Sequence, residues 1–494
     1  MERRNLIKKA LAFDIGASSG RAMLGTFDGK SINVEEIHRF SNDPVILNGI
    51  MYWDVLRLMF EIKQSLVKAK KYGKIDTIGV DTWGVDFGLL DKEGSLLENP
   101  VHYRDRRTEG MLEKSFKKLR KEEFYSITGN QFMEINTAFQ LLSIKENREY
   151  LLERADTLLL IPDLINYFLT GKKASEYSIA STTQLFQLKN RNWSHKVIEA
   201  LELPKGLFTQ IIPSGTVIGN LSDDIISELQ IANSEVIAVA GHDTQSALAA
   251  VPAEHKDFIF LSCGTWSLLG TELEKPIINK KSSKYNITNE GAYGGKVSFL
   301  KNIIGLWLIQ ESRRQWIREG KELSFSELEK LAQQSKPFKC FIDPDDDLFV
   351  PAGNIPERIR EYCRKAGQEI PESEGEIVRC IDESLAMKYK FSLEQIEECT
   401  EKKYGTIYMV GGGIQSGLLC QFTANACGCQ VSAGPVEATV FGNIAIQLMA
   451  KKEINTIQEA REIIRNSENI IYYNPEEEEL WNKVYKRFKE ATKC

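Results

Sequence analysis

The chain has 494 residues, of which 42% are hydrophobic and 27% charged, and its formal net charge is -6 at pH 7. This length exceeds one ordinary hydrophobic core, so two large domains are expected, and the composition excludes a predominantly disordered chain. The net negative charge argues against nucleic acid as the main partner, because binding to a phosphate backbone needs a basic face. The net negative charge is still compatible with an anionic small-molecule substrate held in a local basic pocket.

A membrane or export role is not expected from the sequence. No apolar stretch approaches the roughly 20 residues that cross a bilayer. The N-terminal stretch MERRNLIKKALAFDIG has a basic end and a short apolar run, but Asp14 interrupts that run before an export signal can form. We therefore expect a cytoplasmic protein.

Cysteine and histidine spacing predicts neither a disulfide framework nor a metal site. The nine cysteines all lie at or beyond Cys263, and an odd number confined to one half is not a disulfide pattern. Cys427 and Cys429 form a CxC without a second pair, and the five histidines have no ligand spacing. Structural thiols in a reducing compartment are the expected outcome.

In chain order, the first predicted element is a β-hairpin. Apolar residues 11–16 run into a Gly/Ser turn, and a second apolar run leaves it at residues 22–25. Residues 258–270 repeat this pattern when Gly264 is laid on Gly16. The two short segments lie about half the chain length apart, which indicates an internal duplication.

Predicted strands and helices alternate along the rest of the chain, which is typical of an α/β fold. They comprise a helix over 53–72 ending before Gly73, strands over 75–80, 158–161 and 236–240, helices over 300–318 and 374–389, a strand over 406–410, and a helix from about Gln415. A boundary is expected near residues 251–256, where Pro252 and a charged stretch interrupt the pattern. This predicts domains over 1–250 and 251–494.

The turn of the first hairpin is a candidate phosphate-binding loop. Its small residues let a polyphosphate approach the backbone, whose successive N–H groups can form an anion nest; they are Gly16, Ala17, Ser18, Ser19 and Gly20. Arg21 adds positive charge, and Asp14 at the strand end could hold Mg²⁺ through water. The alternative is an ordinary polar hairpin.

Two further glycine turns are candidates for nucleotide contact. The turn 264–267 has the same glycine and hydroxyl residues, with Ser262 in place of Asp14; two turns that clamp one triphosphate need only one metal-directing carboxylate. Residues 411–413 are three glycines between a predicted strand and a predicted helix, where a flat ligand can approach and helix N–H groups are available. A tight turn without a ligand is the alternative for the three glycines.

Asp243 is the candidate general base. It follows a predicted strand and Gly241, at the expected start of a helix over 245–250. A helix N-terminus favours an ionised carboxylate, and phosphoryl transfer needs a group that orients the acceptor hydroxyl and takes its proton. The alternative is a simple N-cap aspartate.

Together these segments resemble the FGGY family of carbohydrate kinases, from Leu11 to about Ala450. The motifs that carry the resemblance are residues 13–21, 81–87 (Asp-Thr-Trp-Gly-Val-Asp-Phe), 241–245 (Gly-His-Asp-Thr-Gln), 300–310 and 434–439. The resemblance implies duplicated ribonuclease-H-like domains of the actin-like ATPase type that flank a central cleft, with ATP on the C-terminal side.

It also implies an activity, namely transfer of the γ-phosphate of ATP to a sugar. The expected acceptor is O1 of L-rhamnulose, with L-fuculose or L-ribulose as alternatives. His242 and Ala17 stand where other branches of the family often carry glycine and threonine, which weakens a glycerol- or xylulose-kinase interpretation.

The same resemblance assigns roles to residues. Asp243 is implied as the base, and the sugar contacts are implied to be Gly84, His242, Asp243, Thr244 and Asn302, beside Trp83. The implied phosphate contacts are Ala17, Ser18, Ser19, Gly20, Arg21 and Thr265. Gln310 and Gly413 are implied to contact the nucleotide, and Asp14 is implied to serve magnesium.

A non-kinase actin-like ATPase, either a chaperone or a filament protein, is the rival of a different class. Asp243 and the 81–87 segment argue against it, because such proteins have no sugar-facing base. A regulatory sugar-binding protein is disfavoured because no DNA-binding element precedes the first domain. The sequence makes no prediction of the oligomeric state.

Overall fold

The computed structural model describes residues 7–493, which form two compact units. Residues 1–6 of the basic N-terminal stretch and Cys494 lie outside the described part. Unit 1 comprises Met1–Pro252, Glu272–Phe299 and Ala438–Glu468, and unit 2 comprises Ala253–Thr271, Leu300–Glu437 and Asn469–Cys494. Each unit contains both helices and strands, so the α/β prediction is confirmed.

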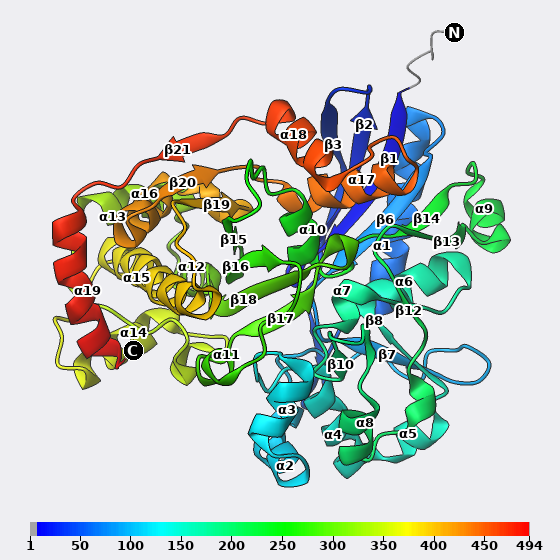
Figure 1. Cartoon of the computed structure of the whole chain (residues 1–494), viewed down its shortest axis with the longest axis horizontal. Helices are drawn as coiled ribbons and strands as arrows, with labels where there is room; N and C mark the ends of the chain where they lie inside the picture. The colour runs from blue at the N-terminus through cyan, green and yellow to red at the C-terminus, as the bar shows by residue number, and fades with distance from the viewer. Residues whose placement is uncertain (1–6, 494) are drawn as a thin grey trace. The chain divides into compact units, whose positions relative to one another are not determined.

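Unit 1 is built on a six-stranded sheet in the order β13-β14-β6-β1-β2-β3. β1 (Lys8–Ile15) and β2 (Ser19–Phe27) form the predicted antiparallel hairpin. On its other side β1 pairs in parallel with β6 (Thr77–Thr82), which pairs in parallel with β14 (Glu235–Ala238) (Figure 1). The carboxyl ends of these three strands therefore lie at one edge of the sheet.

The remaining elements of unit 1 comprise β3 and β13 of this sheet, the helices, and shorter strands, of which β4 and β5, β7 and β8, β9 and β12, and β10 and β11 form two-stranded pairs. They are β3 (Ile32–Ser41), β4 (Val45–Leu47), β5 (Ile50–Tyr52), α1 (Val55–Ala69), β7 (Phe87–Leu90), α2 (Met111–Lys118), α3 (Lys121–Thr128), α4 (Thr137–Arg148), α5 (Tyr150–Arg154), β8 (Thr157–Leu160), α6 (Ile161–Thr170), β9 (Ser175–Glu176), α7 (Tyr177–Ala180), β10 (Phe186–Gln187), β11 (Asn192–Trp193), α8 (His195–Ala200), β12 (Ile211–Ile212), β13 (Thr216–Asn220), α9 (Asp223–Leu229), α10 (Asp243–Ala249), α11 (Lys280–Lys284), β17 (Thr288–Gly291), α17 (Ala438–Ala450) and α18 (Ile457–Ser467).

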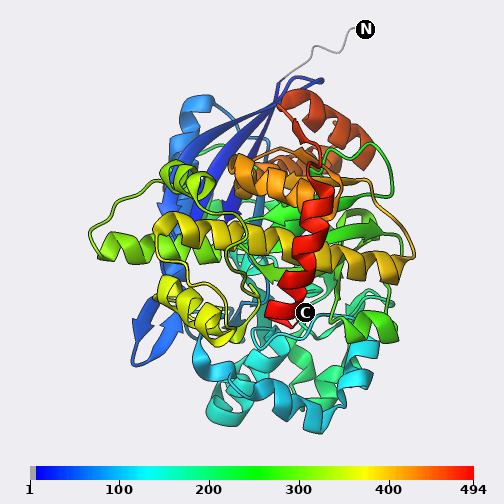
Figure 2. The ribbon, with the colours of Figure 1, turned by 90° about the vertical axis from the view of Figure 1, so that its left-hand side faces the viewer.

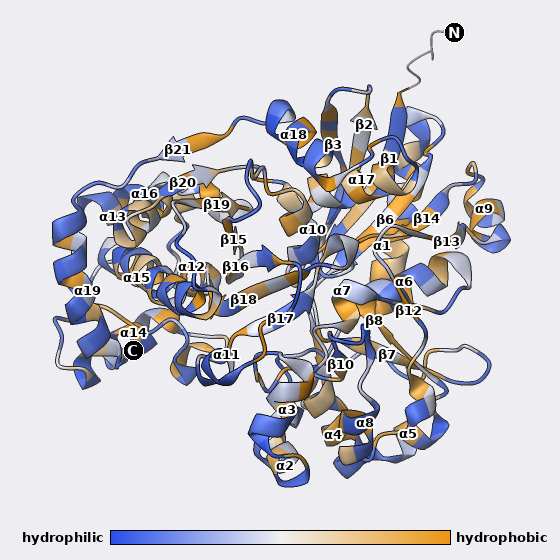
Figure 3. Cartoon of the chain, viewed as in Figure 1, coloured by the Kyte–Doolittle hydropathy of each residue, from blue (hydrophilic) through white to orange (hydrophobic). Residues whose placement is uncertain are grey.

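Helix α17 joins unit 1 although it lies near the C-terminus of the sequence. It packs against α10, β1 and β6 (Figure 1). At its contact with α10, a Cβ on Gly442 would overlap the backbone carbonyl of Ser246. β1 and β6, against which α17 packs, carry buried apolar residues, seen as hydrophobic stretches in Figure 3, and β6 also buries polar residues at its carboxyl end. The fit of α17 therefore fixes the position of α10.

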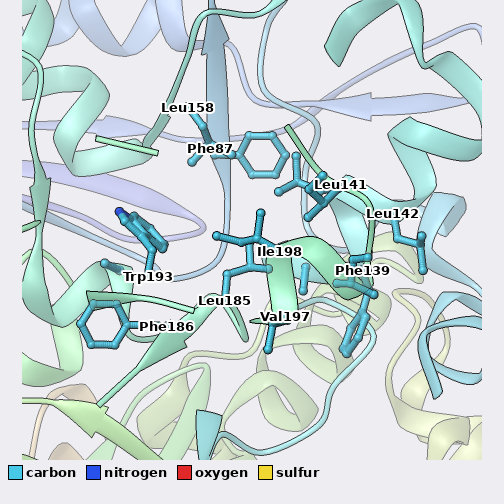
Figure 4. Packing of buried hydrophobic residues seen from close by; sticks show 14 of the residues in the cluster. Phe87, Phe139, Leu141, Leu142, Leu158, Leu185, Phe186, Trp193, Val197 and Ile198 are labelled. Carbon is cyan, nitrogen blue, oxygen red and sulfur yellow. The ribbon is translucent and has the colours of Figure 1, made fainter. Parts of the chain in front are cut away.

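A second hydrophobic core of unit 1 lies away from this sheet. It gathers side chains from β7, β8, β10, β11, α4 and α8, including Phe87, Phe139, Leu158 and Trp193 (Figure 4). The rings of Phe186 and Trp193 meet edge to face with centroids 6.0 Å apart. Such close packing makes this part of the unit a rigid support.

Unit 2 repeats the strand arrangement of unit 1. β15 (Ile259–Cys263) forms an antiparallel hairpin with β16 (Trp266–Leu273) and pairs in parallel with β19 (Thr406–Val410), which pairs in parallel with β20 (Gln430–Ala433). The order β16-β15-β19-β20 thus corresponds to β2-β1-β6-β14. The predicted internal duplication is confirmed.

The remaining elements of unit 2 are mainly helices. They are β18 (Val297–Ile304, whose first three residues belong to unit 1), α12 (Trp307–Arg318), α13 (Phe325–Gln334), α14 (Ile355–Lys365), α15 (Glu374–Thr400), α16 (Gly417–Cys427), β21 (Ile471–Tyr473) and α19 (Glu478–Thr492). The last helix, red in Figure 2, crosses the long yellow helix α15. Trp481 and Phe488 fill the core between these helices.

Two sequence predictions differ from the structure here. Residues 300–318 are not one helix, because β18 ends at Ile304 and α12 begins at Trp307. The break falls at Gly305, where a Cβ would overlap the Ser267 hydroxyl, so this residue serves a close backbone approach rather than a helix. Likewise, residues 412–415 form a 3₁₀ turn and α16 starts at Gly417.

No helix within residues 7–493 is both long enough and apolar enough to span a bilayer.

The α10–α17 contact gives a stability prediction. Gly442→Ala should destabilise the protein by about 1–3 kcal/mol, because the new methyl group must push the two helices apart. Gly206→Ala is the matched control, since a Cβ there meets nothing within 4 Å. Urea unfolding followed by circular dichroism measures both. Equal midpoints for the two variants would contradict the tight helix contact.

Candidate functional site

Three aspartates converge at the carboxyl edge of the unit 1 sheet. Asp14 on β1 is the register partner of Asp81 on β6. One residue later, the N–H of Thr82 donates to the carbonyl of Gly241 at 2.9 Å, which ties the strand to the loop before Asp243. Open α/β sheets bind their ligands at such an edge. The sequence-predicted residues Asp14 and Asp243 are thus brought together, with Asp81 as an addition.

Asp243 is the first residue of α10, and the N-cap position belongs to His242. The simple N-cap alternative is therefore not what the structure shows. The Asp243 carboxylate accepts from the Thr244 N–H at 2.6 Å and from the Thr244 hydroxyl at 3.2 Å, and 32% of its side chain is exposed. Burial raises the pKa of Asp243, the charge of His242 opposes this, and Asp14 adds to the rise. The carboxylate can both ionise and reach a ligand.

His242 lies between two carboxylates. Its Nε2 is 3.5 Å from Asp243 Oδ1, and its Nδ1 is 3.1 Å from Glu290 Oε2. The Nδ1–Glu290 pair is within ion-pair distance, although its angle does not make a hydrogen bond. Burial lowers the pKa of His242, but Glu290 and then Asp243 outweigh burial and raise it. Sequence analysis missed Glu290, because nothing in the local pattern around it signals a site.

A buried glutamate holds the loop that presents His242. Glu176 accepts from the Gly241 N–H at 2.9 Å and from the hydroxyl of Ser178 at 2.5 Å. The Ser178 hydroxyl in turn accepts from the His242 N–H at 3.3 Å. Glu176 is 1% exposed, and burial raises its pKa against these hydrogen bonds. It is a second residue that sequence analysis missed.

The predicted phosphate turn is a closed hairpin turn. The Gly16 N–H donates to the Ser19 carbonyl at 2.9 Å, and Asn42 binds the turn through Gly16 and Ser18. Ser18 is exposed, and Ala17 and Ser19 are half-buried. A Cβ on Gly20 would overlap the Phe40 ring, so packing explains this glycine. The exposed part of the turn is available to a ligand. Sequence analysis missed Asn42, because it lies more than 20 residues from the turn that it binds.

Arg21 and Asp81 define the charge environment of Asp14. Arg21 Nη2 lies 2.5 Å from Asp14 Oδ2. Asp81 is fully buried, and its Oδ2 accepts from Asn443 Nδ2 at 2.5 Å, while its Oδ1 has no hydrogen-bond partner. Burial, followed by Asp14, raises the pKa of Asp81 well above its usual range. An unpaired buried carboxyl oxygen beside a second carboxylate fits a hard cation such as Mg²⁺.

Gly84 lies in the turn that follows β6, supported by buried groups. A Cβ there would meet Thr182 at 3.4 Å, and the Thr182 hydroxyl accepts from the Val85 N–H at 3.2 Å. The neighbouring Trp83 donates its indole N–H to Asp86 at 3.0 Å. Burial raises the pKa of Asp86 to about 6, which hydrogen bonds from Trp53 and others oppose. The indole N–H of Trp83 is therefore committed to the protein interior.

In unit 2, three predicted nucleotide residues come together. The Thr265 hydroxyl is 3.3 Å from Gln310 Oε1, and the Thr265 carbonyl accepts from the Trp307 N–H at the start of α12. Gly413 packs against Cys263, where a Cβ would overlap the sulfur. Packing thus explains Gly413 in part, and its neighbour Gly411 adopts a positive φ of 87°. Both glycine turns border the end of β15.

Asn302 is half-buried on β18, three residues before Gly305, whose N–H donates to the Thr265 carbonyl of the hairpin turn at 3.1 Å. Two residues after Asn302, the Ile304 N–H donates to Asp345 Oδ1 at 2.8 Å. Lys388 Nζ lies 3.2 Å from the other Asp345 oxygen. This ion pair anchors the end of the strand, and the role of Asn302 stays a prediction.

The described cysteines lie mainly in the interior of the protein. Seven of the eight are buried and none forms a disulfide. The spacing did not reveal that Cys340, Cys363 and Cys380 place their sulfur atoms within 4.8 Å of one another in unit 2. All three thiols are buried.

Comparison with solved structures shows the fold. A crystal structure of ligand-bound xylulose kinase from Lactobacillus acidophilus superposes with a TM-score of 0.79 at 16% identity, covering 98% of this chain and 97% of that one. Glycerol kinase of Plasmodium falciparum with ADP gives a TM-score of 0.78 at 16% identity, with the same coverage. The two-domain kinase fold, consistent with the ribonuclease-H-like, actin-like class, is therefore confirmed.

Comparison with known sequences is more specific. The chain is 41% identical over 483 residues to the rhamnulokinase of Bacteroides thetaiotaomicron, covering 98% of this chain and 99% of that protein. It is 38% identical over 467 residues to the rhamnulokinase of Bacillus subtilis, covering 94% and 95%. Models of the N-terminal and C-terminal domains of the FGGY carbohydrate kinases match residues 9–250 and 259–451. The chain belongs to the FGGY family of carbohydrate kinases.

Proposed function

We propose that the chain transfers the γ-phosphoryl group of ATP to O1 of L-rhamnulose and so forms L-rhamnulose 1-phosphate in the breakdown of L-rhamnose. Rhamnulokinases that align over nearly the whole chain at about 40% identity support the substrate. The observation that carries the reaction type is the partly exposed Asp243 carboxylate at the start of α10, beside Asp14 and Asp81. The kinase family makes ATP the second substrate.

In this proposal Asp243 is the general base. Its carboxylate accepts the proton of the sugar hydroxyl as that oxygen attacks the γ-phosphorus. Gly84, His242 and Thr244 contact the sugar, and the His242 charge keeps Asp243 ionised. Asn302 is proposed as a further sugar contact from unit 2.

The nucleotide roles follow the two glycine turns. Ala17, Ser18, Ser19, Gly20 and Arg21 in unit 1 and Thr265 in unit 2 are proposed to contact phosphates, and Gln310 and Gly413 the nucleotide. Asp14, with Asp81 behind it, would hold Mg²⁺, which neutralises phosphate charge when bound. Arg21 orients Asp14 through their ion pair.

Substrate identity is tested by a coupled ADP-release assay across ketoses and aldoses. L-Rhamnulose should give the highest kcat/KM, with L-fuculose and L-ribulose well behind. If L-fuculose or L-ribulose gives the highest kcat/KM, the assignment of L-rhamnulose as substrate is wrong, while the assignment as a sugar kinase stands. ATP hydrolysis that no sugar stimulates would contradict the proposed reaction and revive the non-kinase ATPase.

The base assignment is tested by Asp243→Asn. This isosteric change removes the proton acceptor, so kcat should fall by about 10²- to 10⁴-fold. Binding of a fluorescent ATP analogue should change little, because the change is confined to the sugar side of the reaction. A variant with wild-type kcat would refute Asp243 as the base.

The pH dependence follows from the raised pKa of Asp243. The base acts only when ionised, so lowering the pH through a pKa above the ordinary aspartate value inactivates it. We expect kcat/KM for the sugar to fall on the acidic side, with an apparent pKa above 3.8. A steady-state pH profile measures this limb. An activity that stays level down to pH 4 would contradict the raised pKa of Asp243.

A further inference from the structure

We propose that Glu290 is a positioning residue for the sugar site, which fixes the ring orientation of His242 and holds a proton on its Nδ1, so that Nε2 faces Asp243. The inference rests on the proposed function, because it assigns to Glu290 a task only if Asp243 is the base. Glu290 contacts the reaction through His242 and is not itself a catalytic residue.

The geometry places Glu290 at the back of the histidine. Glu290 Oε2 lies 3.1 Å from His242 Nδ1 and also accepts from Gln245 Nε2 at 3.1 Å. His242 precedes Asp243 directly and Gln245 follows it by two residues at the start of α10, so one carboxylate contacts a residue on each side of the base. On the far side of the ring, Nε2 is 3.5 Å from Asp243 Oδ1. The three side chains thus lie in a row in space, with His242 between Glu290 and Asp243.

The strand that carries Glu290 is held firmly in unit 1. The Gly291 N–H donates to the Ser181 hydroxyl at 2.7 Å, and a Cβ on Gly291 would meet the Tyr177 ring at 2.6 Å. On the other side, the Asn289 N–H donates to the Gly129 carbonyl at 2.9 Å. A group that orients a site residue must itself be fixed by packing and hydrogen bonds, and Glu290 meets this requirement.

The burial of Glu290 determines how it affects the protonation of His242. The Glu290 side chain is 6% exposed and that of His242 is 10% exposed. A buried carboxylate needs a paired cation or hydrogen-bond donors. His242 is the cationic partner that the structure places against it, and the neutral amide of Gln245 supplies a second donor. The carboxylate therefore favours the doubly protonated imidazolium, in which both ring nitrogens carry a proton.

The charges that face His242 come from three elements. They are Glu290 on β17, Asp243 on α10 and, more distantly, Glu176 on β9. Asp243 in turn faces Asp14, which carries Arg21 as its own partner. All three groups around the imidazole are acidic, and their sum overcomes the burial that would strip its proton. Glu290 is the nearest of the three acids and raises the pKa of His242 most, so its removal should have the largest effect on the His242 proton.

A purely structural role for Glu290 is the competing explanation, and the chain offers a matched control. Glu272 is a buried glutamate of unit 1 whose oxygens lie 2.9 Å from Arg461 and 2.6 Å from Lys296. Its side chain is 7% exposed, close to that of Glu290. Glu272→Gln therefore repeats the same chemical change at a similar depth without a histidine partner.

The test uses full-length Glu290→Gln, Glu290→Asp and Glu272→Gln proteins. The chain has five histidines, so the His242 signal can be followed by NMR of histidine-labelled protein and assigned by its loss in His242→Asn. In Glu290→Gln, His242 should lose its proton at a lower pH than in the wild type. Its kcat/KM for the sugar should fall by about 10- to 100-fold, and the acidic limb of its pH profile should move to higher pH. Binding of the ATP analogue should be unchanged.

Glu290→Asp retains the negative charge, so its His242 titration and its pH profile should both lie between those of Glu290→Gln and the wild type. Glu272→Gln should lower the melting temperature and leave the His242 titration and the pH profile as in the wild type. If Glu290→Gln matches Glu272→Gln in titration and profile, the inference is overturned. Should Glu290→Gln fail to fold, an unshifted His242 titration in Glu290→Asp overturns it equally. If the wild type phosphorylates no sugar, the proposed function fails, while the NMR titration still decides whether Glu290 governs His242.

Discussion

The candidate chemistry depends on one constraint: the parallel register of β1, β6 and β14 in unit 1. Register fixes which residues stand side by side at the end of a sheet, and a slip of one residue would turn every side chain to the other face. Here it aligns Asp14 with Asp81 and brings Thr82 to the loop that ends at Asp243. Helix α17 secures this alignment from one face, because Gly442 lets it approach α10 and Asn443 donates to Asp81.

The same alignment carries an electrostatic cost. Buried carboxylates at one sheet edge repel one another and lose their hydration, so the pKa values of Asp81 and Asp243 rise. The fold opposes this cost at each acid with a separate donor: Arg21 for Asp14, Asn443 for Asp81, and His242 with Thr244 for Asp243. Such partly compensated acids are typical of sites that await a cationic ligand or a proton.

Much of this was predictable from sequence where the signal is local. The hairpin at Gly16, its repeat at Gly264 and the start of α10 near Asp243 all follow from apolar runs that meet small residues. The predictions failed where tertiary packing decides: Gly305 ends a strand because Ser267 lies against it, which a helical pattern of apolar residues cannot reveal. Glu290, Glu176 and Asn42 were missed for the same reason, since their partners are distant in sequence. Nor does any local signal show that residues 438–468 join unit 1.

The duplication explains why the two units have different chemistry on the same backbone. In unit 1 the register pair at the sheet edge is Asp14 and Asp81, whereas the corresponding pair in unit 2 is Ser262 and Val410. The strand that carries Asp81, β6, ends at Thr82 and is followed by the Trp83–Gly84 turn, whereas its counterpart β19 is followed by three glycines. Unit 2 thus presents hydroxyl and backbone groups where unit 1 presents carboxylates. The proposed reaction needs one general base and one metal-directing acid, and a second acidic edge would only add repulsion against an anionic phosphate.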